Sequence, residues 1–447
     1  MNEFDPFDTA IETLGPAKIK SKILDEISGT SEEIFKSDDD RILIDVTASN
    51  IIKQIGAKQT PPTFELAGPR KKIYFDPSKL KCAVVTCGGL CPGINNVIRA
   101  IVLELHYRYR VRHIYGIRYG LQGFIPEFDH PVMELTADTV VNIHEMGGSI
   151  LGSSRGPQNI EDIVDCLERM NIGILFMIGG DGTLKAASSI SEEIKKRKTK
   201  ISVIGIPKTI DNDIFRLARS FGFDTAVDIA TTAIKGAHME AEGYPNGIGM
   251  IKLMGRHSGF IAATATLAQQ DVNFVLIPEI DFELEGKNGL LTKLEKRLKE
   301  RKHAVIVVAE GAGQKFFKDV EADHDASGNL KLFDIGLFLK DKIQSYFHGK
   351  GTEVSIKYID PSYMIRSLPA NANDHVYCGF LGRDAVHAGM AGKTNMLIGH
   401  WNNFFVNVPI PATVGKRKRI NPQGKIWQTV LEATGQGDLT NPVEEKD

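Results

Sequence analysis

The sequence predicts an α/β protein built from two doubly wound domains behind an N-terminal extension. Three observations support this fold class: short apolar runs recur along the chain, glycine-rich turns follow several of them, and helix-like segments separate them. Apolar runs without polar alternation are typical of parallel strands that are buried on both faces. Strands that alternate with helices form parallel sheets with helices on both sides. We expect an extension over 1–76 and domains over 77–222 with 366–413 and over 223–365 with 414–447.

Composition and charge narrow the class of protein. The chain has 447 residues, of which 42% are hydrophobic and 25% are charged, and its formal net charge is -2. This balance is typical of globular domains and disfavours a nucleic-acid partner, which requires a clearly basic face. No apolar stretch approaches the roughly 18 residues that span a bilayer. The five cysteines are too scattered for a disulfide framework. We therefore expect a cytoplasmic protein with reduced thiols and no membrane partner.

The N-terminal extension differs from the rest of the chain. It combines acidic clusters, such as 37–41, with short apolar stretches and a break at Pro61 and Pro62. No catalytic pattern occurs there. We expect this extension to pack against the body of the protein or against a neighbouring subunit.

Two glycine-rich loops in the first domain suit a phosphate group. Gly88 and Gly89 follow the expected strand Lys81–Thr86 and precede a helix. Glycines at this place allow a phosphate to approach backbone N–H groups, although the spacing differs from that of a dinucleotide fingerprint. The stretch 147–157 holds one cation, Arg155, whose guanidinium matches a phosphate. A surface loop with a solvated arginine is the alternative.

The turn Gly179–Thr183 is central to the prediction. It follows the apolar run Ile172–Ile178 and precedes an expected helix over 184–195. Its glycines suit a phosphate, Thr183 is in place to cap the helix, and Asp181 is the only acid of the turn. This combination predicts a polyphosphate ligand with a metal ion. An ordinary turn between a strand and a helix is the alternative.

An acidic turn follows the next expected strand, Ile201–Ile206. Asp211 and Asp213 come shortly after Lys208 and Thr209. Helix capping needs only one short polar residue, so this density of polar groups favours chemistry.

The second half continues the alternation of strands and helices. One turn contains Arg256, and Glu310 follows another expected strand. Lys357, Tyr363 and Arg366 are candidates for the wall of an anionic-substrate site. The helices and strands expected from here to the C-terminal region are 225–242, 248–253, 274–277, 289–302, 304–309, 374–388 and 394–399.

A tight basic cluster, Lys416–Arg419, lies near the C-terminus. A run of like charges is usually solvated, so we expect this cluster to be exposed.

Taken in order, these motifs resemble those of the 6-phosphofructokinase family. Several motifs in one order are more specific than any one of them. The resemblance covers about Lys81 to Trp401 and rests on the Gly88-Gly89 loop, 152–155, 179–183, 207–213, 254–256, Glu310 and 363–366. The stretch Tyr358–Tyr363, Lys208 and the long extension are similar to the branch that contains plant and trypanosome enzymes.

The resemblance implies two Rossmann-like domains with a cleft between them, and phosphoryl transfer from ATP to the 1-hydroxyl of fructose 6-phosphate. It implies that Asp211 accepts the hydroxyl proton and that Asp181 binds Mg²⁺. The residues that match the donor site are Gly88, Gly89, Arg155, Gly156, Gly180, Asp181, Gly182 and Thr183. Those that match the sugar-phosphate site are Thr209, Ile210, Asp211, Met254, Gly255, Arg256, Glu310, Tyr363 and Arg366. The implied catalytic set is Asp211, Asp213, Thr209, Arg256 and Gly182.

The sequence departs from the bacterial pattern of the family at two positions. Gly247 and Lys357 stand where bacterial ATP-using relatives have arginines, the first of which reaches the sugar phosphate from a neighbouring subunit. The family resemblance otherwise implies a homotetramer or homodimer with allosteric control, acting in glycolysis.

The phosphoryl donor is predicted from two further positions. In the family, an aspartate in place of Gly182 accompanies pyrophosphate use, and a lysine at the position of Lys208 is also found in pyrophosphate users. A carboxylate at 182 would block and repel the α-phosphate of a nucleotide, whereas glycine leaves room for it. We therefore predict ATP as the donor, with pyrophosphate as the alternative.

Two other classes of protein share part of this pattern. NAD and lipid kinases have a turn like Gly179–Thr183 but do not by themselves predict the segments 207–213 and 254–256. A nucleotide-binding regulatory subunit of the same fold is disfavoured because Asp181 and Asp211 are both present.

Overall fold

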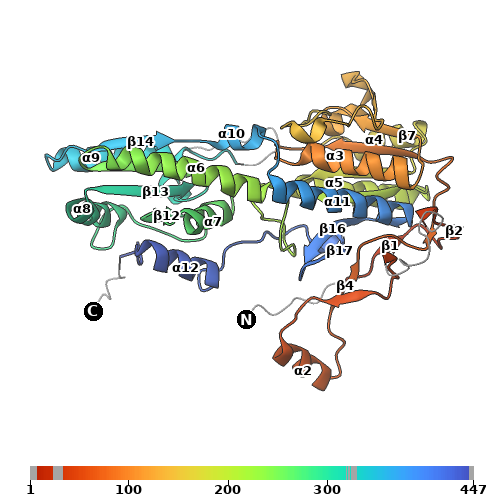
Figure 1. Ribbon diagram of the computed structural model, residues 1–447, viewed down its shortest axis with the longest axis horizontal. Helices are drawn as coiled ribbons and strands as arrows, with labels where there is room; N and C mark the ends of the chain where they lie inside the picture. The colour runs from red at the N-terminus through yellow and green to blue at the C-terminus, as the bar shows by residue number, and fades with distance from the viewer. Residues whose placement is uncertain (1–7, 24–33, 319, 321–322, 324–329, 442–447) are drawn as a thin grey trace. The chain divides into compact units, whose positions relative to one another are not determined.

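The structure, a computed structural model, describes residues 8–23, 34–318, 320, 323 and 330–441 (Figure 1). The chain divides into two compact units, each built on its own β-sheet. The first unit comprises Met1–Thr209, Ile214–Gly222 and Leu368–Lys416, and the second comprises Ile210–Asp213, Phe223–Ser367 and Arg417–Asp447. The short segment Ile210–Asp213, which we placed in the first predicted domain, belongs to the second unit.

The first unit is built on a nine-stranded sheet with the order β3-β4-β17-β16-β10-β9-β6-β7-β8. The central strands β16, β10, β9, β6 and β7 are parallel, and the outer strands are antiparallel to their neighbours. In sheet order the strands are Arg41–Leu43, Thr63–Leu66, Phe404–Pro409, Met396–Trp401, Ser202–Pro207, Ile174–Gly179, Lys81–Thr86, His113–Ile117 and Met133–Glu134.

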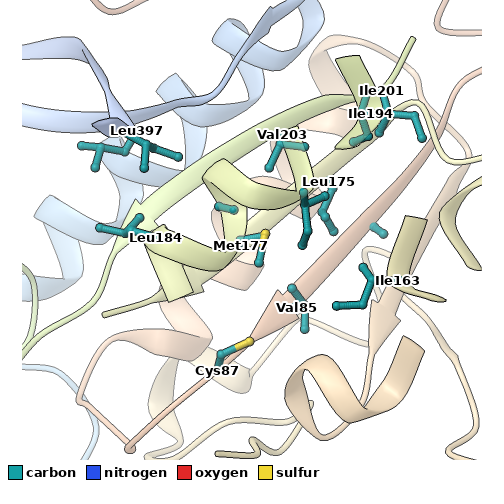
Figure 2. Close-up of a cluster of buried hydrophobic side chains, with 14 of the residues drawn as sticks. Val85, Cys87, Ile163, Leu175, Met177, Leu184, Ile194, Ile201, Val203 and Leu397 are labelled. Atoms are coloured by element: carbon teal, nitrogen blue, oxygen red, sulfur yellow. The ribbon is translucent and has the colours of Figure 1, made fainter. Parts of the chain in front are cut away.

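Helices cover both faces of this sheet because its central strands are apolar on both sides. On one face, Leu175, Met177 and Val203 pack with residues of α4 and α5, as Figure 2 shows. On the other face, α11 lies so close to the sheet that a side chain at Gly389 would meet Ile174. Among the described residues, the α-helices of this unit are α2 (Ala48–Gly56), α3 (Ile94–Leu103), α4 (Ile160–Arg169), α5 (Asp181–Arg197) and α11 (Ala372–Met390).

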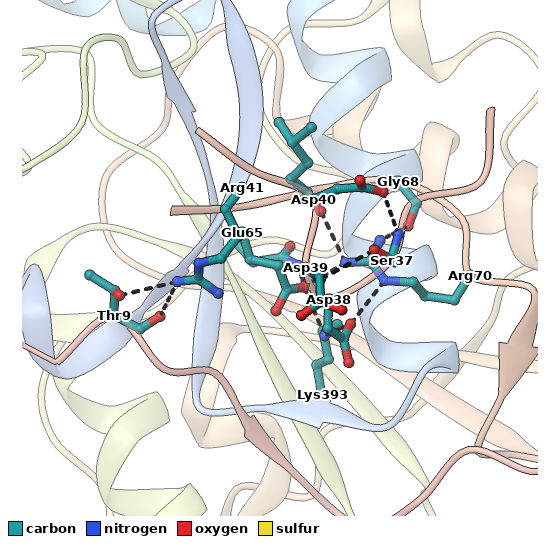
Figure 3. Close-up of polar contacts among 12 residues, drawn as sticks. Thr9, Ser37, Asp38, Asp39, Asp40, Arg41, Glu65, Gly68, Arg70 and Lys393 are labelled. Carbon is teal, nitrogen blue, oxygen red and sulfur yellow. Dashed lines mark hydrogen bonds and ion pairs between the residues drawn. The ribbon is translucent and has the colours of Figure 1, made fainter. Parts of the chain in front are cut away.

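The N-terminal extension forms part of the first unit. Its strands β3 and β4 join the large sheet, and the short strands β1 (Glu12–Thr13) and β2 (Ile19–Lys20) pair with β15 (Lys393–Thr394) and β5 (Lys72–Ile73). Ion pairs hold the extension in place (Figure 3): the buried carboxylate of Glu65 lies 2.8 Å from Lys393 and 2.5 Å from Arg70. Both cations also contact Asp38, at 2.9 and 3.2 Å.

The second unit is a four-stranded parallel sheet with the order β12-β13-β11-β14. In that order the strands are Phe274–Leu276, His303–Ala309, Gly247–Leu253 and Ser355–Ile359. Side chains of α6, α7 and α12 pack on one face of the sheet, and those of α8 and α9 pack on the other. The helices are α6 (Phe223–Glu242), α7 (Phe260–Gln269), α8 (Leu290–Arg301), α9 (Ile335–Gly349), α10 (Ser362–Ser367) and α12 (Lys425–Thr434).

Both units therefore have the doubly wound α/β architecture that the sequence predicts. None of the five cysteines, all of which lie in the described residues, forms a disulfide. Within the described part of the chain, no helix combines the length and the apolar character needed to cross a membrane.

Candidate functional site

Three neighbouring strands of the first unit end at the same edge of the sheet. Because β6, β9 and β10 are adjacent and parallel, the loops that follow them meet there. The amide of Cys87 donates to the carbonyl of Ile178 at 2.9 Å, and the amide of Lys208 donates to the carbonyl of Gly179 at 2.9 Å. The ammonium group of Lys208 then reaches the carbonyl of Gly89 at 2.6 Å. The structure therefore ties the first glycine loop, the central turn and Lys208 together.

The loop that carries Arg155 joins the same edge. The amide of Gly88 donates to the carbonyl of Ser154 at 3.1 Å, and the hydroxyl of Ser153 donates back to the carbonyl of Gly88 at 2.6 Å. Gly88 has a φ of 82°, which favours glycine. Arg155 itself is exposed. The three motifs that we assigned to the donor site, which are the Gly88-Gly89 loop, the Arg155 loop and the central turn, thus lie at one end of the first sheet.

Helix α5 begins within the central turn, at Asp181, and Gly180 is its N-cap. The prediction that Thr183 caps the helix is wrong, because the helix starts before Thr183 and places it, buried, in the first turn. The first amides of a helix have no partner within it, so α5 presents N–H groups and the positive end of its dipole at this edge.

Two side-chain positions of this turn bear on the predicted ligand. The carboxylate of Asp181 pairs with the ammonium group of Lys185 at 2.9 Å. Gly182 is exposed, and a side-chain carbon built there would meet no heavy atom within 4 Å. The turn therefore offers a carboxylate beside open space.

The second unit gathers a separate group of predicted residues. The hydroxyl of Ser258 donates to the carbonyl of Asp211 at 3.1 Å, and the amide of Arg256 lies 3.5 Å from the carboxylate of Asp211. At the ends of β11 and β13, the amide of Glu310 donates to the carbonyl of Leu253 at 2.9 Å. Asp211, Arg256 and Glu310, which are far apart in the sequence, are thus neighbours in the structure.

The electrostatic environment of Asp211 differs from that of an exposed aspartate. Burial raises the pKa of Asp211 to about 8, and the charges of Asp213 and Glu310 act in the same direction. The amide of Arg256 and the charge of Arg366 oppose this rise. Burial also raises the pKa of Glu310. Carboxyl groups with strongly raised pKa values are typical of sites where a proton is transferred.

The basic cluster near the C-terminus is only partly exposed, because Lys416 and Arg419 are exposed as predicted whereas Arg417 and Lys418 contribute to this group. Arg417 lies 2.6 Å from the carboxylate of Asp213, and the ammonium group of Lys418 donates to the side-chain carbonyl of Asn212 at 2.9 Å. Burial lowers the pKa of Lys418 to about 7. No spacing in the sequence indicates these contacts, since Arg417 and Asp213 are 204 positions apart.

The remaining predicted sugar-phosphate residues are distributed as follows. Met254 and Gly255 are buried, and a side chain at Gly255 would lie 2.5 Å from the carbonyl of Ser258. Arg256 donates through its guanidinium to the carbonyl of Leu330. Thr209, in the first unit, accepts a hydrogen bond from Ser220 through its carbonyl at 2.6 Å.

Helix α10 carries Tyr363, which is 81% exposed, and the guanidinium of Arg366 lies 5.8 Å from its ring. Lys357, which we grouped with these two residues, contacts Glu240 at 3.8 Å and the ring of Tyr244 at 4.2 Å instead.

Comparison with known proteins identifies the family. The family model described as phosphofructokinase matches residues 81–389 of the chain. The chain belongs to the phosphofructokinase family. The matched range spans every predicted site residue, from Gly88 to Arg366, but not Arg417 or Lys418.

Three relatives extend the phosphofructokinase match beyond this range. An ATP-dependent 6-phosphofructokinase from Borreliella burgdorferi is 51% identical over 96% of this chain and 97% of its own length. The enzyme of the same name from Amycolatopsis methanolica is 44% identical over 96% of this chain and 95% of its own. The chloroplastic ATP-dependent 6-phosphofructokinase 5 of Arabidopsis thaliana is 43% identical over 97% of this chain and 82% of its own.

Solved structures support the phosphofructokinase fold. A pyrophosphate-dependent phosphofructokinase from Marinobacter aquaeolei has a TM-score of 0.65 and 20% identity, covering 82% of this chain and 94% of that one. Phosphofructokinase from Saccharomyces cerevisiae has a TM-score of 0.60 and 22% identity, covering 75% and 45%. Resemblance at this level of identity concerns the fold alone.

Proposed function

We propose that this chain transfers the terminal phosphoryl group of ATP to the 1-hydroxyl of fructose 6-phosphate, forming fructose 1,6-bisphosphate. The observation that carries this proposal is the high identity, over nearly the full chain, to bacterial ATP-dependent 6-phosphofructokinases. The grouping of Asp211, Arg256 and Glu310 in the second unit provides the matching chemistry.

Proton transfer from the sugar is assigned to Asp211. A general base works best when its pKa lies near the working pH, and burial raises the pKa of Asp211 to about 8. The negative charge of Asp213, held beside Arg417, keeps Asp211 basic. Asp211 would therefore accept the hydroxyl proton as the new phosphate–oxygen bond forms.

Binding of the sugar phosphate is assigned to cations and backbone groups of the second unit. The charge of Arg366 lowers the pKa of Asp211, and the charges of Arg256 and Arg366 both lower the pKa of Glu310, so both guanidinium groups lie near the acids of this group. Guanidinium groups match phosphate oxygens in geometry and charge. Thr209, Ile210, Met254, Gly255, Glu310 and Tyr363 complete the proposed sugar-phosphate site.

Binding of the donor is assigned to the end of the first sheet. The glycines of the two loops and the N-terminal amides of α5 suit a polyphosphate, and Lys208 and Arg155 add positive charge. Phosphoryl transfer depends on positioning and on neutralising charge, with little covalent chemistry from the protein. These groups would therefore hold the donor in line for transfer.

The central turn offers a ligand that suits a magnesium ion. Asp181 offers carboxylate oxygens, the ligands that Mg²⁺ prefers, at the start of α5. When bound, Mg²⁺ would neutralise charge on the donor phosphates. Asp181 is the residue that we propose as its protein ligand.

Purified protein tests this function in one assay with Mg²⁺ and fructose 6-phosphate, run once with ATP and once with pyrophosphate. We expect fructose 1,6-bisphosphate to form with ATP. If only pyrophosphate supports the reaction, pyrophosphate and not ATP is the donor. If neither compound supports it, the proposal is overturned.

We also propose a cytoplasmic location and a homodimer or homotetramer, as the family resemblance implies. Sedimentation of the purified protein measures the oligomeric state, and a monomer at working concentrations would contradict this part.

A further inference from the structure

Two histidines and a glutamate meet in the second unit, outside the proposed phosphoryl-transfer site. His238 and Glu242 are one helical turn apart at the C-terminal end of α6, and His303 is the first residue of β13. His238 is 17% exposed and His303 is 22% exposed, whereas Glu242 is 46% exposed. The cluster is therefore open to solvent on the side of Glu242 and enclosed on the side of the imidazoles.

The three nearest ligand atoms form a compact triangle. The Nε2 atoms of His238 and His303 are 3.3 Å apart, and the same Oε1 atom of Glu242 lies 3.5 Å from the first and 3.9 Å from the second. The point equidistant from these three atoms lies about 2.1 Å from each, the length of zinc–nitrogen and zinc–carboxylate bonds. One divalent ion of that size would contact all three atoms without rearrangement.

A carboxylate behind His238 orients its ring. The Nδ1 atom of His238 lies 3.4 Å from the carboxylate of Asp271, which accepts a hydrogen bond from Gln269 at 2.7 Å. A carboxylate at this place favours the proton on Nδ1 and leaves the lone pair of Nε2 directed at the centre of the triangle. Carboxylate–histidine pairs of this kind commonly support metal ligands.

Close packing fixes the distance between α6 and the sheet. A side-chain carbon at Gly247 would lie 2.0 Å from the carbonyl of Ala241, and one at Gly249 would lie 2.7 Å from the carbonyl of Ala237. Gly247 is the register partner of His303 on the neighbouring strand. The two glycines therefore let the helix approach β11 and β13 closely enough for its side chains to reach His303.

We propose that His238, Glu242 and His303 form a binding site for a divalent transition-metal ion, with Zn²⁺ as the best match. Two imidazoles and one carboxylate suit Zn²⁺, whereas Mg²⁺ and Ca²⁺ prefer oxygen ligands alone. This site is therefore chemically distinct from the one proposed at Asp181. A water molecule would occupy the fourth position.

A bound ion would link the C-terminal end of α6 to the first residue of β13. An ion that binds the folded protein and not the unfolded chain raises the stability of the fold in proportion to its occupancy. The site carries no proposed catalytic group, so its occupation should change stability without being required for phosphoryl transfer.

Calorimetry and thermal unfolding test this proposal with Zn²⁺ alone as the probe, on EDTA-treated full-length protein without nucleotide. We expect one Zn²⁺ per chain and a rise in the unfolding temperature on adding Zn²⁺. Both should be lost in His303→Gln and in His238→Gln. In Asp271→Asn we expect Zn²⁺ to bind at least about 10-fold more weakly, because that carboxylate only orients a ligand.

His113→Gln is the matched control, since His113 is an exposed histidine at the first position of another strand, β7. Because Cys166 is the cysteine with partial exposure, Cys166→Ser controls for binding to a thiol. The absorption spectrum of Co²⁺ bound to the wild-type protein is a second test that needs no variant. If nitrogen and oxygen atoms are the ligands, we expect no thiolate charge-transfer band in this spectrum.

Equal Zn²⁺ binding in wild type and His303→Gln, or a thiolate band with Co²⁺, would overturn the proposal. So would the absence of Zn²⁺ binding at micromolar concentrations, which would leave a hydrogen bond between the two rings as the explanation of their short distance.

Discussion

The guanidinium of Arg417 lies 2.6 Å from the carboxylate of Asp213, and this contact joins the C-terminal segment to the acidic turn. The side chain of Asp213 is 7% exposed, so Arg417 is a close cationic partner of a buried carboxylate. Arg417→Met should lower the free energy of unfolding by about 1–3 kcal/mol, less than the loss of a fully buried partner because Arg417 is itself 32% exposed. Urea unfolding measures this change.

Arg419→Met is the control for this variant, since Arg419 belongs to the same cluster and is exposed. Equal stability of wild type and Arg417→Met would show that Asp213 does not need the cation.

The assignment of Asp211 as the base predicts a specific kinetic defect. Asp211→Asn keeps the size of the side chain but cannot accept the hydroxyl proton, so kcat should fall by about 10²–10⁴ while KM for fructose 6-phosphate changes little. Asp341→Asn, at an exposed position of α9, should leave kcat unchanged. A variant that turns over at the wild-type rate would remove Asp211 from this role.

The raised pKa of Asp211 predicts the pH dependence of the reaction. A base acts only when deprotonated, and kcat/KM reports the pKa of the free enzyme. As the pH falls through about 8, Asp211 becomes protonated, so kcat/KM should decline; above this value it should level off.

Glu310→Gln removes one of the negative charges that raise this pKa and should move the midpoint to lower pH. Glu300→Gln, an exposed acid of α8, should leave the midpoint in place. A wild-type midpoint near 4, the ordinary value for an aspartate, would contradict the environment described for Asp211.

Local sequence patterns predict most of the central strands and their turns. The runs that form β6, β9 and β10 are mainly apolar and do not alternate with polar residues, and such runs are typical of strands covered on both faces. Because the carboxyl ends of parallel strands share an edge, the sequence places Gly88, Gly179 and Lys208 at one edge of a sheet, and the pairing of β9 with both β6 and β10 makes them neighbours there. Helix α5 starts earlier than the sequence predicts because Gly180, which has no side chain, serves as the N-cap in place of a polar residue.

Contacts between distant segments could not be predicted in this way. His238 and His303 are 65 positions apart, and the register of β11 and β13 with the packing of α6 brings them together. Lys418 reaches Asn212 for a similar reason. In each case the partners are determined by tertiary packing, which no local pattern records.

The ion pairs of the extension predict its contribution to stability. Lys393 and Glu65 are each 4% exposed and lie 2.8 Å apart. Lys393→Met removes a buried partner of Glu65, so the free energy of unfolding should fall by about 3 kcal/mol, at the lower end of the usual range because Arg70 stays beside the carboxylate. Urea unfolding tests this, with Lys72→Met at an exposed position as the control. Unfolding at the same urea concentration in all three proteins would show that this contact adds nothing.

The choice of phosphoryl donor predicts opposite behaviour for two substitutions at Gly182. Since a side-chain carbon at this position meets no heavy atom within 4 Å, both Gly182→Ala and Gly182→Asp should fold. The carboxylate of Gly182→Asp would repel the phosphates of ATP, and kcat/KM for ATP should fall at least about 10-fold, which corresponds to about 1.4 kcal/mol. Gly182→Ala adds volume without charge and should retain most of the activity. Steady-state kinetics with ATP separate the two variants, and full ATP activity in Gly182→Asp would refute the argument that open, uncharged space at 182 admits the nucleotide.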